Sequence, residues 1–275
     1  MRLDEAFDRE VARLEKLPIV TTELISEGGD RESNGRGTLL VVEAVELGRN
    51  PGMSKSELEA EFQRVLGVRN VIWLGPGLRE DHHLFLGPIT LQSGEPAYTA
   101  ITTNGHVDEF ARFVSPRKVL LAEVPPEDRS DPIGAENHRR LEENYARLKA
   151  ASDQDGQPLD IVRVPLPRPT VTTMRPGDPV YDFLATLDYP PKAPFPTGQL
   201  IKVIAAASYL NFLITDEVVV APKYGERDQQ VQEILQATFP DRKIVMLDML
   251  AINFGGGGIH CITMPEPRMN EAESP

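Results

Sequence analysis

The sequence predicts a mixed α/β fold assembled from repeated units of helix and strand. Three segments carry apolar residues at helical spacing, and each is followed after a short loop by an apolar segment typical of a strand. A further β-rich piece precedes each helix, which gives the order β, α, β three times. This order is compatible with an open doubly wound sheet and with a closed ring of similar modules.

The three units follow one another along the chain. In the first, Leu58 and Phe62 fall on one face of the predicted helix, and in the third, Val231 and Leu235 do the same. The first unit spans 37–45, 54–67 and 70–74; the second spans 118–124, 137–151 and 159–166; the third spans 208–224, 228–239 and 242–248.

Two long stretches interrupt these units. Residues 75–104 show little periodicity, and residues 165–199 hold nine of the 24 prolines. Loops of this length in a compact protein are usually functional or lack regular structure. We therefore predict two irregular loops within a single domain that covers residues 1–275.

Composition limits the partners and the location of the protein. The 275 residues carry a formal net charge of −13, which disfavours nucleic acid and anionic membrane surfaces as partners. The charged N-terminal segment lacks the apolar core of a signal peptide, and residues 203–214 are too short and too polar to span a bilayer. The lone cysteine excludes an intrachain disulfide. These features predict a cytoplasmic protein.

The lone cysteine, Cys261, follows a run of four glycines, Gly255, Gly256, Gly257 and Gly258, in the stretch GGGGIHC. Such a run gives the backbone a freedom that ordinary packing does not need. Cys261 is therefore either a small buried apolar residue or a nucleophile that the glycines let a substrate approach.

Candidate partners for the thiol lie far away in the sequence. His106 and Asp108 are two residues apart, so an extended segment would direct both to one face and Val107 to the core. Glu27 and Asp30 flank two glycines before a predicted strand, and paired carboxylates suit a guanidinium group. An ordinary acidic turn is the alternative for that pair.

Other polar residues have plainer interpretations. His260 precedes Cys261, so in a strand it would face away from the thiol and be structural. His82 and His83 lack partners at metal-ligand spacing, and we predict no metal site. Asn211 either braces the site by hydrogen bonds or only satisfies buried backbone groups.

Taken together, the motifs resemble those of the guanidino-group-modifying enzymes, and most closely the agmatine deiminase and bacterial peptidylarginine deiminase family. The matches occur in the family's order and cover nearly the whole chain. The matching stretches are EGG (27–29), NGRGTLL (34–40), RNP (49–51), LGVRNVIWL (66–74), GHVDEFARF (105–113), SYLNFLI (208–214) and GGGGIHCIT (255–263).

The resemblance implies a pentein fold, a five-bladed α/β propeller of ββαβ-like pseudo-repeats with its site on the axis. It also implies that Cys261 is the nucleophile and His106 the general acid and base. Asp108 would hold the guanidinium group, and Glu27 or Asp30 would add negative charge nearby. No cofactor is implied.

Two features depart from the family pattern. Relatives carry a further N-terminal portion with an Arg-Asp element, and no such pair occurs upstream of Glu27. We therefore expect a propeller incomplete at its N-terminus, with edge strands that invite association into a homo-oligomer. Agmatine-specific relatives usually carry Asn where this chain has Gly258, directly before Ile259, His260 and the expected nucleophile.

The leading hypothesis is a deiminase-type hydrolase that converts a guanidino group to a ureido group and releases ammonia. The first candidate for its small cationic substrate is agmatine, which would place the protein in putrescine and polyamine biosynthesis. Alternatives are deimination of arginine or peptidyl-arginine, amidino transfer to an amine, and a fragment or pentein-like protein that binds a cation without catalysis.

Overall fold

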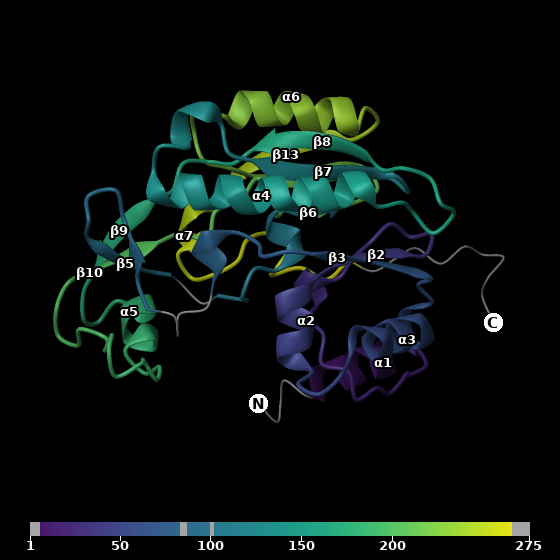
Figure 1. Cartoon of the computed structure of the whole chain (residues 1–275), viewed down its shortest axis with the longest axis horizontal. Helices are drawn as coiled ribbons and strands as arrows, with labels where there is room; N and C mark the ends of the chain where they lie inside the picture. Colours follow the sequence, from purple (N-terminus) through teal and green to yellow (C-terminus); the bar gives the residue numbers. More distant parts are fainter. Residues whose placement is uncertain (1–5, 83–86, 100–101, 266–275) are drawn as a thin grey trace.

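The computed structural model describes residues 6–82, 87–99 and 102–265, and these residues form four small β-sheets (Figure 1). In three of the sheets, a short first strand pairs antiparallel with the second, and the second pairs parallel with the third. At least one helix connects the second and third strands in each case. The mixed α/β fold is thereby confirmed.

The first of these sheets follows the short turn η2 (Gly28–Asp30). It contains β1 (Glu32–Ser33), β2 (Thr38–Val42) and β3 (Asn70–Leu74), with helices α2 (Glu43–Arg49) and α3 (Lys55–Leu66) before β3. The strand predicted over 37–45 ends at Val42, because the helix begins immediately at Glu43. Helix α3 begins where a capping box predicts, since Ser54 and Glu57 bond each other's backbone amides.

The second and third sheets share this order. The second contains β6 (Ala111–Phe113), β7 (Lys118–Glu123) and β8 (Asp160–Pro165), with η6 (Pro126–Asp128) and α4 (Pro132–Ala150) before β8. The third contains β11 (Leu213–Ile214), β12 (Val218–Lys223) and β13 (Lys243–Asp248), with α6 (Asp228–Thr238) before β13. Helix α4 begins five residues before the predicted boundary, because Asp131 caps it and Pro132 opens it.

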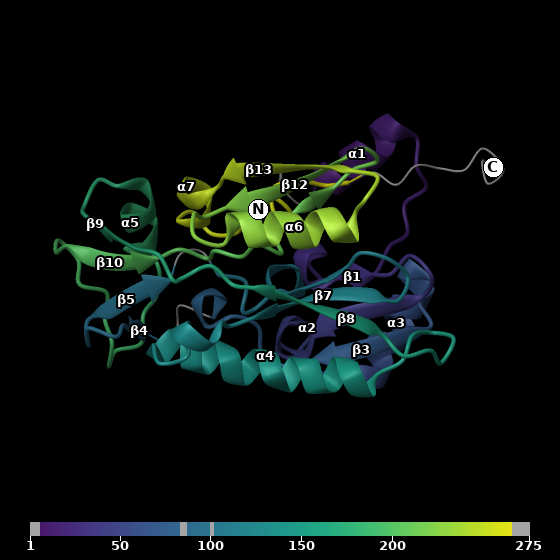
Figure 2. The ribbon, with the colours of Figure 1, turned by 90° about the horizontal axis from the view of Figure 1, so that it is seen from above.

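Three of the four strands of the fourth sheet lie in the two stretches that were predicted to be irregular, and the other follows directly after the second stretch. Its strand order is β4 (Ile89–Thr90), β5 (Pro96–Thr99), β10 (Ile201–Ile204) and β9 (Val171–Met174), and α5 (Pro179–Leu184) covers it. The prediction of irregular loops was therefore wrong for β4, β5 and β9, which are too short to show a period. Figures 1 and 2 place this sheet at one end of the molecule, away from α3.

The remaining elements are short or peripheral. Helix α1 (Phe7–Glu15) contributes no buried residue, and η3 (Arg79–Asp81), η5 (Val107–Glu109) and α7 (Leu250–Asn253) are single turns. Among the described residues, no helix is both long and apolar enough to cross a membrane.

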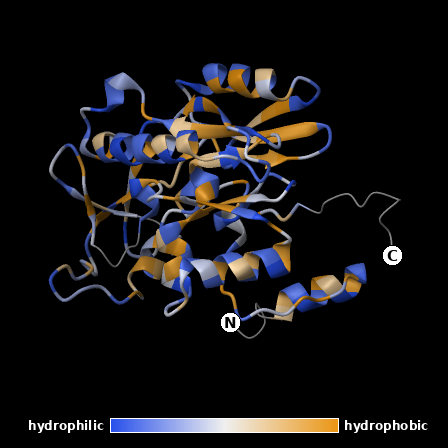
Figure 3. Cartoon of the chain, turned by 45° about the vertical axis from the view of Figure 1, so that its right-hand side comes forward, coloured by the Kyte–Doolittle hydropathy of each residue, from blue (hydrophilic) through white to orange (hydrophobic). Residues whose placement is uncertain are grey.

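The helices bind neighbouring sheets to one another. Helix α4 packs on β7 of its own sheet and on β3 of the first sheet, and α6 packs on β13 and on β8. The main core therefore draws fully buried residues from all three sheets, including Leu40, Leu120 and Val219. Figure 3 shows the strands coloured mostly hydrophobic, whereas the helices alternate between hydrophobic and hydrophilic.

A buried ion pair joins the same three sheets. The guanidinium of Arg112, from β6, donates to Glu32 of β1 at 2.8 Å. It also donates to the carbonyls of Leu210 and Phe212, at 3.1 and 2.8 Å, just before β11. Because both charged side chains are buried, the contacts of Arg112 are not exchanged with water.

Arg112→Met should destabilise the fold by about 3–5 kcal/mol, because it leaves the Glu32 carboxylate buried and uncompensated. The free energy of unfolding in urea measures this change. Arg139→Met is the matched control, since Arg139 pairs with Glu136 on an exposed face and should contribute less than about 1 kcal/mol. Equal losses for both variants would contradict a special role for Arg112.

Candidate active site

The motif GHVDE, residues 105–109, forms a single tight turn. Asp81 accepts hydrogen bonds from the backbone amides of Gly105 and His106, at 3.0 and 3.1 Å, and η5 begins directly afterwards. The predicted extended segment was therefore wrong. Even so, the turn directs Val107 into the core, as predicted, and buries Asp108 completely.

His106 and Asp108 both pack over Gly29. A Cβ atom placed on Gly29 would lie 2.5 Å from His106 Nδ1 and 3.1 Å from Asp108 Oδ2. Real Cβ atoms essentially never show a contact as short as the first of these, so the observed packing of His106 requires a glycine at position 29. The stretch EGG thus brings residues of two distant segments together.

Glu27 fixes the other side of the His106 ring. Its Oε2 atom lies 2.6 Å from His106 Nε2, and its carboxylate accepts a bidentate hydrogen bond from Arg49 at 2.7 and 3.1 Å. Burial would raise the pKa of Glu27, but the hydrogen bonds from His106 and Arg49 lower it to about 2. Asn50, next to Arg49, anchors the same segment by bonding both backbone groups of Ile25.

Asp30 has a different role from the one predicted. It is fully buried, and its two oxygens accept hydrogen bonds from the backbone amides of Val42 and Val107, at 3.0 and 3.2 Å. Burial raises the pKa of Asp30, although these hydrogen bonds oppose the shift. The carboxylate therefore braces η5 against β2 and has no free oxygen for a ligand.

The glycine run shapes the turn that carries Cys261. Gly256 and Gly257 have φ values of 94° and 81°, in the left-handed region that favours glycine. A Cβ atom on Gly258 would lie 2.6 Å from Asn211 Oδ1, so this glycine permits the close approach of Asn211. Gly255 is less restricted, with its nearest contact at 3.2 Å.

Asn211 lies at the centre of the site and bonds several of its side chains, so it does more than satisfy buried backbone groups. It is fully buried, and the stretch 208–212 is not a strand, in contrast to the prediction, because its polar groups bond to the site. The Nδ2 group donates to Asp108, Glu109 and the Cys261 sulfur, at 3.1, 3.0 and 3.2 Å. The Oδ1 atom accepts from the backbone amide of His260 at 2.8 Å.

The Cys261 thiol lies on two buried carboxylates. Cys261 is exposed, and its sulfur is 3.5 Å from Asp108 Oδ2 and 3.7 Å from Glu109 Oε1. Although the residue as a whole is exposed, the protein atoms packed around the sulfur and the charges of Glu109 and Asp108 raise the pKa of the thiol. Among the described residues that bond the sulfur, His106 is absent.

His260 faces the site, which corrects the prediction that it points away. Because residues 259–262 form a turn and not a strand, its Nδ1 atom lies 2.7 Å from Asp108 Oδ2. Sequence reasoning also missed Glu109, whose place next to Asp108 in the motif was the available signal. His82 is described, whereas His83 lies outside the described residues.

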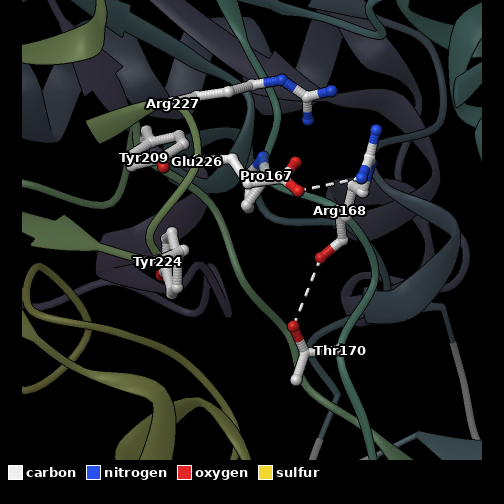
Figure 4. A pocket seen from close by; sticks show the side chains of 7 residues that line it. All are labelled: Pro167, Arg168, Thr170, Tyr209, Tyr224, Glu226 and Arg227. Carbon is white, nitrogen blue, oxygen red and sulfur yellow. Dashed lines mark hydrogen bonds and ion pairs between the residues drawn. The ribbon is translucent and has the colours of Figure 1, made fainter. Parts of the chain in front are cut away.

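A separate cavity of about 220 Å³ lies beside α6 (Figure 4). Its two arginines are already paired: Arg168 with Asp128 and Glu226, both at 2.9 Å, and Arg227 with Glu127 at 3.1 Å. The cavity therefore offers no unpaired cation for an anionic ligand. It is lined by Pro167, Arg168, Thr170, Tyr209, Tyr224, Glu226 and Arg227.

Comparison with known proteins places this arrangement in a family. The model of the Porphyromonas-type peptidyl-arginine deiminases matches residues 1–85 and 88–267. The chain belongs to this family. It is 32% identical to the agmatine deiminase of Medicago truncatula over 270 residues, which cover 96% of this chain and 63% of the relative. It is 31% identical to the agmatine deiminase of Pseudomonas aeruginosa, with coverages of 98% and 64%.

The fold of the family is also seen in a solved structure. The agmatine deiminase of Enterococcus faecalis superimposes with a TM-score of 0.72 at 30% identity, over 96% of this chain and 64% of that one. The chain thus spans less than two thirds of the length of each of these relatives within the family.

Gly29→Ala should displace the His106 ring from Glu27, because the new Cβ would overlap His106 Nδ1. Gly28→Ala is the matched control, since a Cβ at Gly28 meets no atom within 4 Å. The imidazole signals of His106 in NMR spectra measure the displacement. Unchanged His106 signals in Gly29→Ala would contradict the close approach.

The ion pair between Glu27 and Arg49 should stabilise the fold only where Glu27 is ionised. Because the pKa of Glu27 falls from 4.5 to about 2, this stabilisation is complete above pH 4.5 and disappears as the pH falls through 2. The difference in unfolding free energy between the wild type and Arg49→Gln should therefore shrink over that window. A difference that stays constant down to pH 2 would contradict the assignment.

Proposed function

We propose that this chain carries the reactive thiol of a guanidino-group deiminase, with agmatine as the first candidate substrate. One observation supports this proposal above all. The thiol of Cys261, a residue exposed at the surface, lies 3.5 Å from Asp108 Oδ2, while Asp108 Oδ1 is buried without a hydrogen-bond partner among the described residues. A guanidinium held by that carboxylate would present its central carbon to the sulfur.

The reaction would proceed through a covalent intermediate. The sulfur of Cys261 attacks the guanidinium carbon, and the C–N bond to the departing ammonia breaks. Water then hydrolyses the amidino-thioether to the ureido product and frees the thiol. His106, oriented by Glu27, would give the proton to ammonia and accept one from water.

The charge of the site supports a cationic substrate without a carboxylate. Asp108 and Glu109 lie beneath the thiol, and no arginine or lysine bonds either of them among the described residues. Free arginine would need a cationic partner for its own carboxylate. Agmatine has no such group, and agmatine deiminase is the name that both curated relatives carry.

We further propose that the three similar sheets are blades of an α/β propeller. Their shared strand order and the position of η5, Asn211 and Cys261 between them support this arrangement. The cytoplasmic location, the association into homo-oligomers, the single domain and the absence of a metal stay predictions.

The chain should release ammonia and a ureido product from agmatine faster than from arginine or peptidyl-arginine. Asp108→Asn should raise KM and lower kcat together, since it removes the charge that pairs with the guanidinium. His106→Ala should spare binding and lower kcat by about 10²–10⁴-fold, the usual contribution of a general acid or base. A colorimetric ureido assay measures turnover, with the Enterococcus faecalis enzyme as the positive control.

Calorimetric titration with agmatine distinguishes an enzyme from a protein that only binds the cation. Binding without product, unchanged in Cys261→Ala, would identify a protein that binds a cation without catalysis. A guanidino product in the presence of glycine would instead indicate amidino transfer.

A further inference from the structure

Glu109 is a second carboxylate at the thiol, and the proposed reaction leaves it without a role. Its side chain is buried, and its Oε1 atom lies 3.7 Å from the Cys261 sulfur and accepts from Asn211 at 3.0 Å. The Oε2 atom is buried and has no partner among the described residues. A buried carboxylate oxygen without a donor is costly unless the group takes up a proton or a ligand.

The other candidate proton acceptors are already occupied. Asp108 Oδ2 accepts from His260 and from Asn211, at 2.7 and 3.1 Å, and its other oxygen would receive the guanidinium. His106 Nε2 bonds Glu27, and the ring does not bond the sulfur. The S–H group of Cys261 therefore has Glu109 as the neighbour with the most unused capacity.

The surroundings of Glu109 are predominantly acidic. Asp108 and Asp81 add negative charge, and the Arg112 guanidinium is committed to Glu32. Burial, Asp108 and Asp81 raise the pKa of Glu109 well above its ordinary value, which favours uptake of a proton by its carboxylate. The groups that act on the Glu109–Cys261 pair are Asp81, Asp108, Arg112, Asn211 and Tyr224.

We propose that Glu109 is the base that takes the thiol proton of Cys261 when a cation occupies the site. The S–H bond breaks, its proton moves to the carboxylate of Glu109, and the electron pair left on sulfur attacks the electrophilic carbon. The step moves no charge into or out of the site, because thiol and carboxylate become thiolate and carboxylic acid. The role of this transfer in catalysis rests on the function proposed above. The sharing of one proton between Glu109 and Cys261, called the shared proton below, does not.

The first test needs no substrate, because Cys261 is the only cysteine and alkylation by iodoacetamide reports on it alone. Glu109→Gln should make alkylation at neutral pH about tenfold faster, which corresponds to a fall of one unit in the thiol pKa. Glu80→Gln is the matched control: Glu80 is also buried, but it bonds Asn137, at 2.7 Å, and not the thiol. Its alkylation profile should equal that of the wild type.

The second test uses agmatine. Glu109→Gln should lower kcat by about a hundredfold with little change in KM, because the proton acceptor is lost while Asp108 remains. Faster alkylation with slower turnover is a combination that a merely structural residue would not produce. Glu109→Asp, which keeps the charge, should retain the slow alkylation of the wild type, and faster alkylation in that variant would contradict the carboxylate as the cause.

The outcomes separate this inference from the proposed function. An unchanged pH profile of alkylation in Glu109→Gln would overturn the shared proton. Faster alkylation with undiminished kcat would overturn the catalytic role. Faster alkylation in a chain that turns over none of the guanidino compounds would support the shared proton and count against the deiminase activity.

Discussion

The contacts of the Arg112 side chain connect three of the four sheets. Its guanidinium connects β6 to β1 through Glu32 and grips the carbonyls of Leu210 and Phe212. These two residues flank Asn211, so the same buried cation that joins three sheets also places the amide at the centre of the site. Stability and site geometry therefore depend on one desolvated charge, whose loss would leave several acceptors unpaired.

The electrostatics around the thiol differ from those of most reactive cysteines. A thiolate is usually favoured by a nearby cation, a metal or a helix N-terminus. Here the sulfur touches two carboxylates, and its pKa is raised. The raised pKa favours the protonated thiol, and in the proposed reaction a bound guanidinium would supply positive charge beside it. In the proposed reaction, the acidity that attracts the cation would also keep the thiol protonated until the cation binds.

Much of the fold follows from local patterns in the sequence. The helix over 54–67 and the strand over 70–74 were predicted within one residue, because an amphipathic face, a Ser–Glu cap and a following glycine act together. The fourth sheet was missed, since strands of two to four residues among prolines carry no period. Their pairing is long-range: β5 pairs with β10, about a hundred residues later.

The site shows the same division between local and long-range information. Cys261, His106, Asp108 and Glu27 could be proposed from motifs, and the structure brings each of them to one region. The orientations could not be predicted, because they depend on backbone conformation. A tight turn replaced the assumed strand at His106, and another directed His260 towards Asp108. Asp30 looked like a ligand group, but backbone amides that no sequence pattern reveals occupy it.

The amide of Asn211 has a consequence for which side chains its position can accept. Its nitrogen faces three acceptors, and its oxygen receives a backbone N–H. Aspartate has the same shape but would place a fourth acceptor against the other three, and leucine could serve neither side. Glutamine offers the right groups on a stem one carbon too long for the gap left by Gly258. Position 211 therefore admits asparagine and little else, and the pattern of donors and acceptors dictates that choice more strictly than volume does.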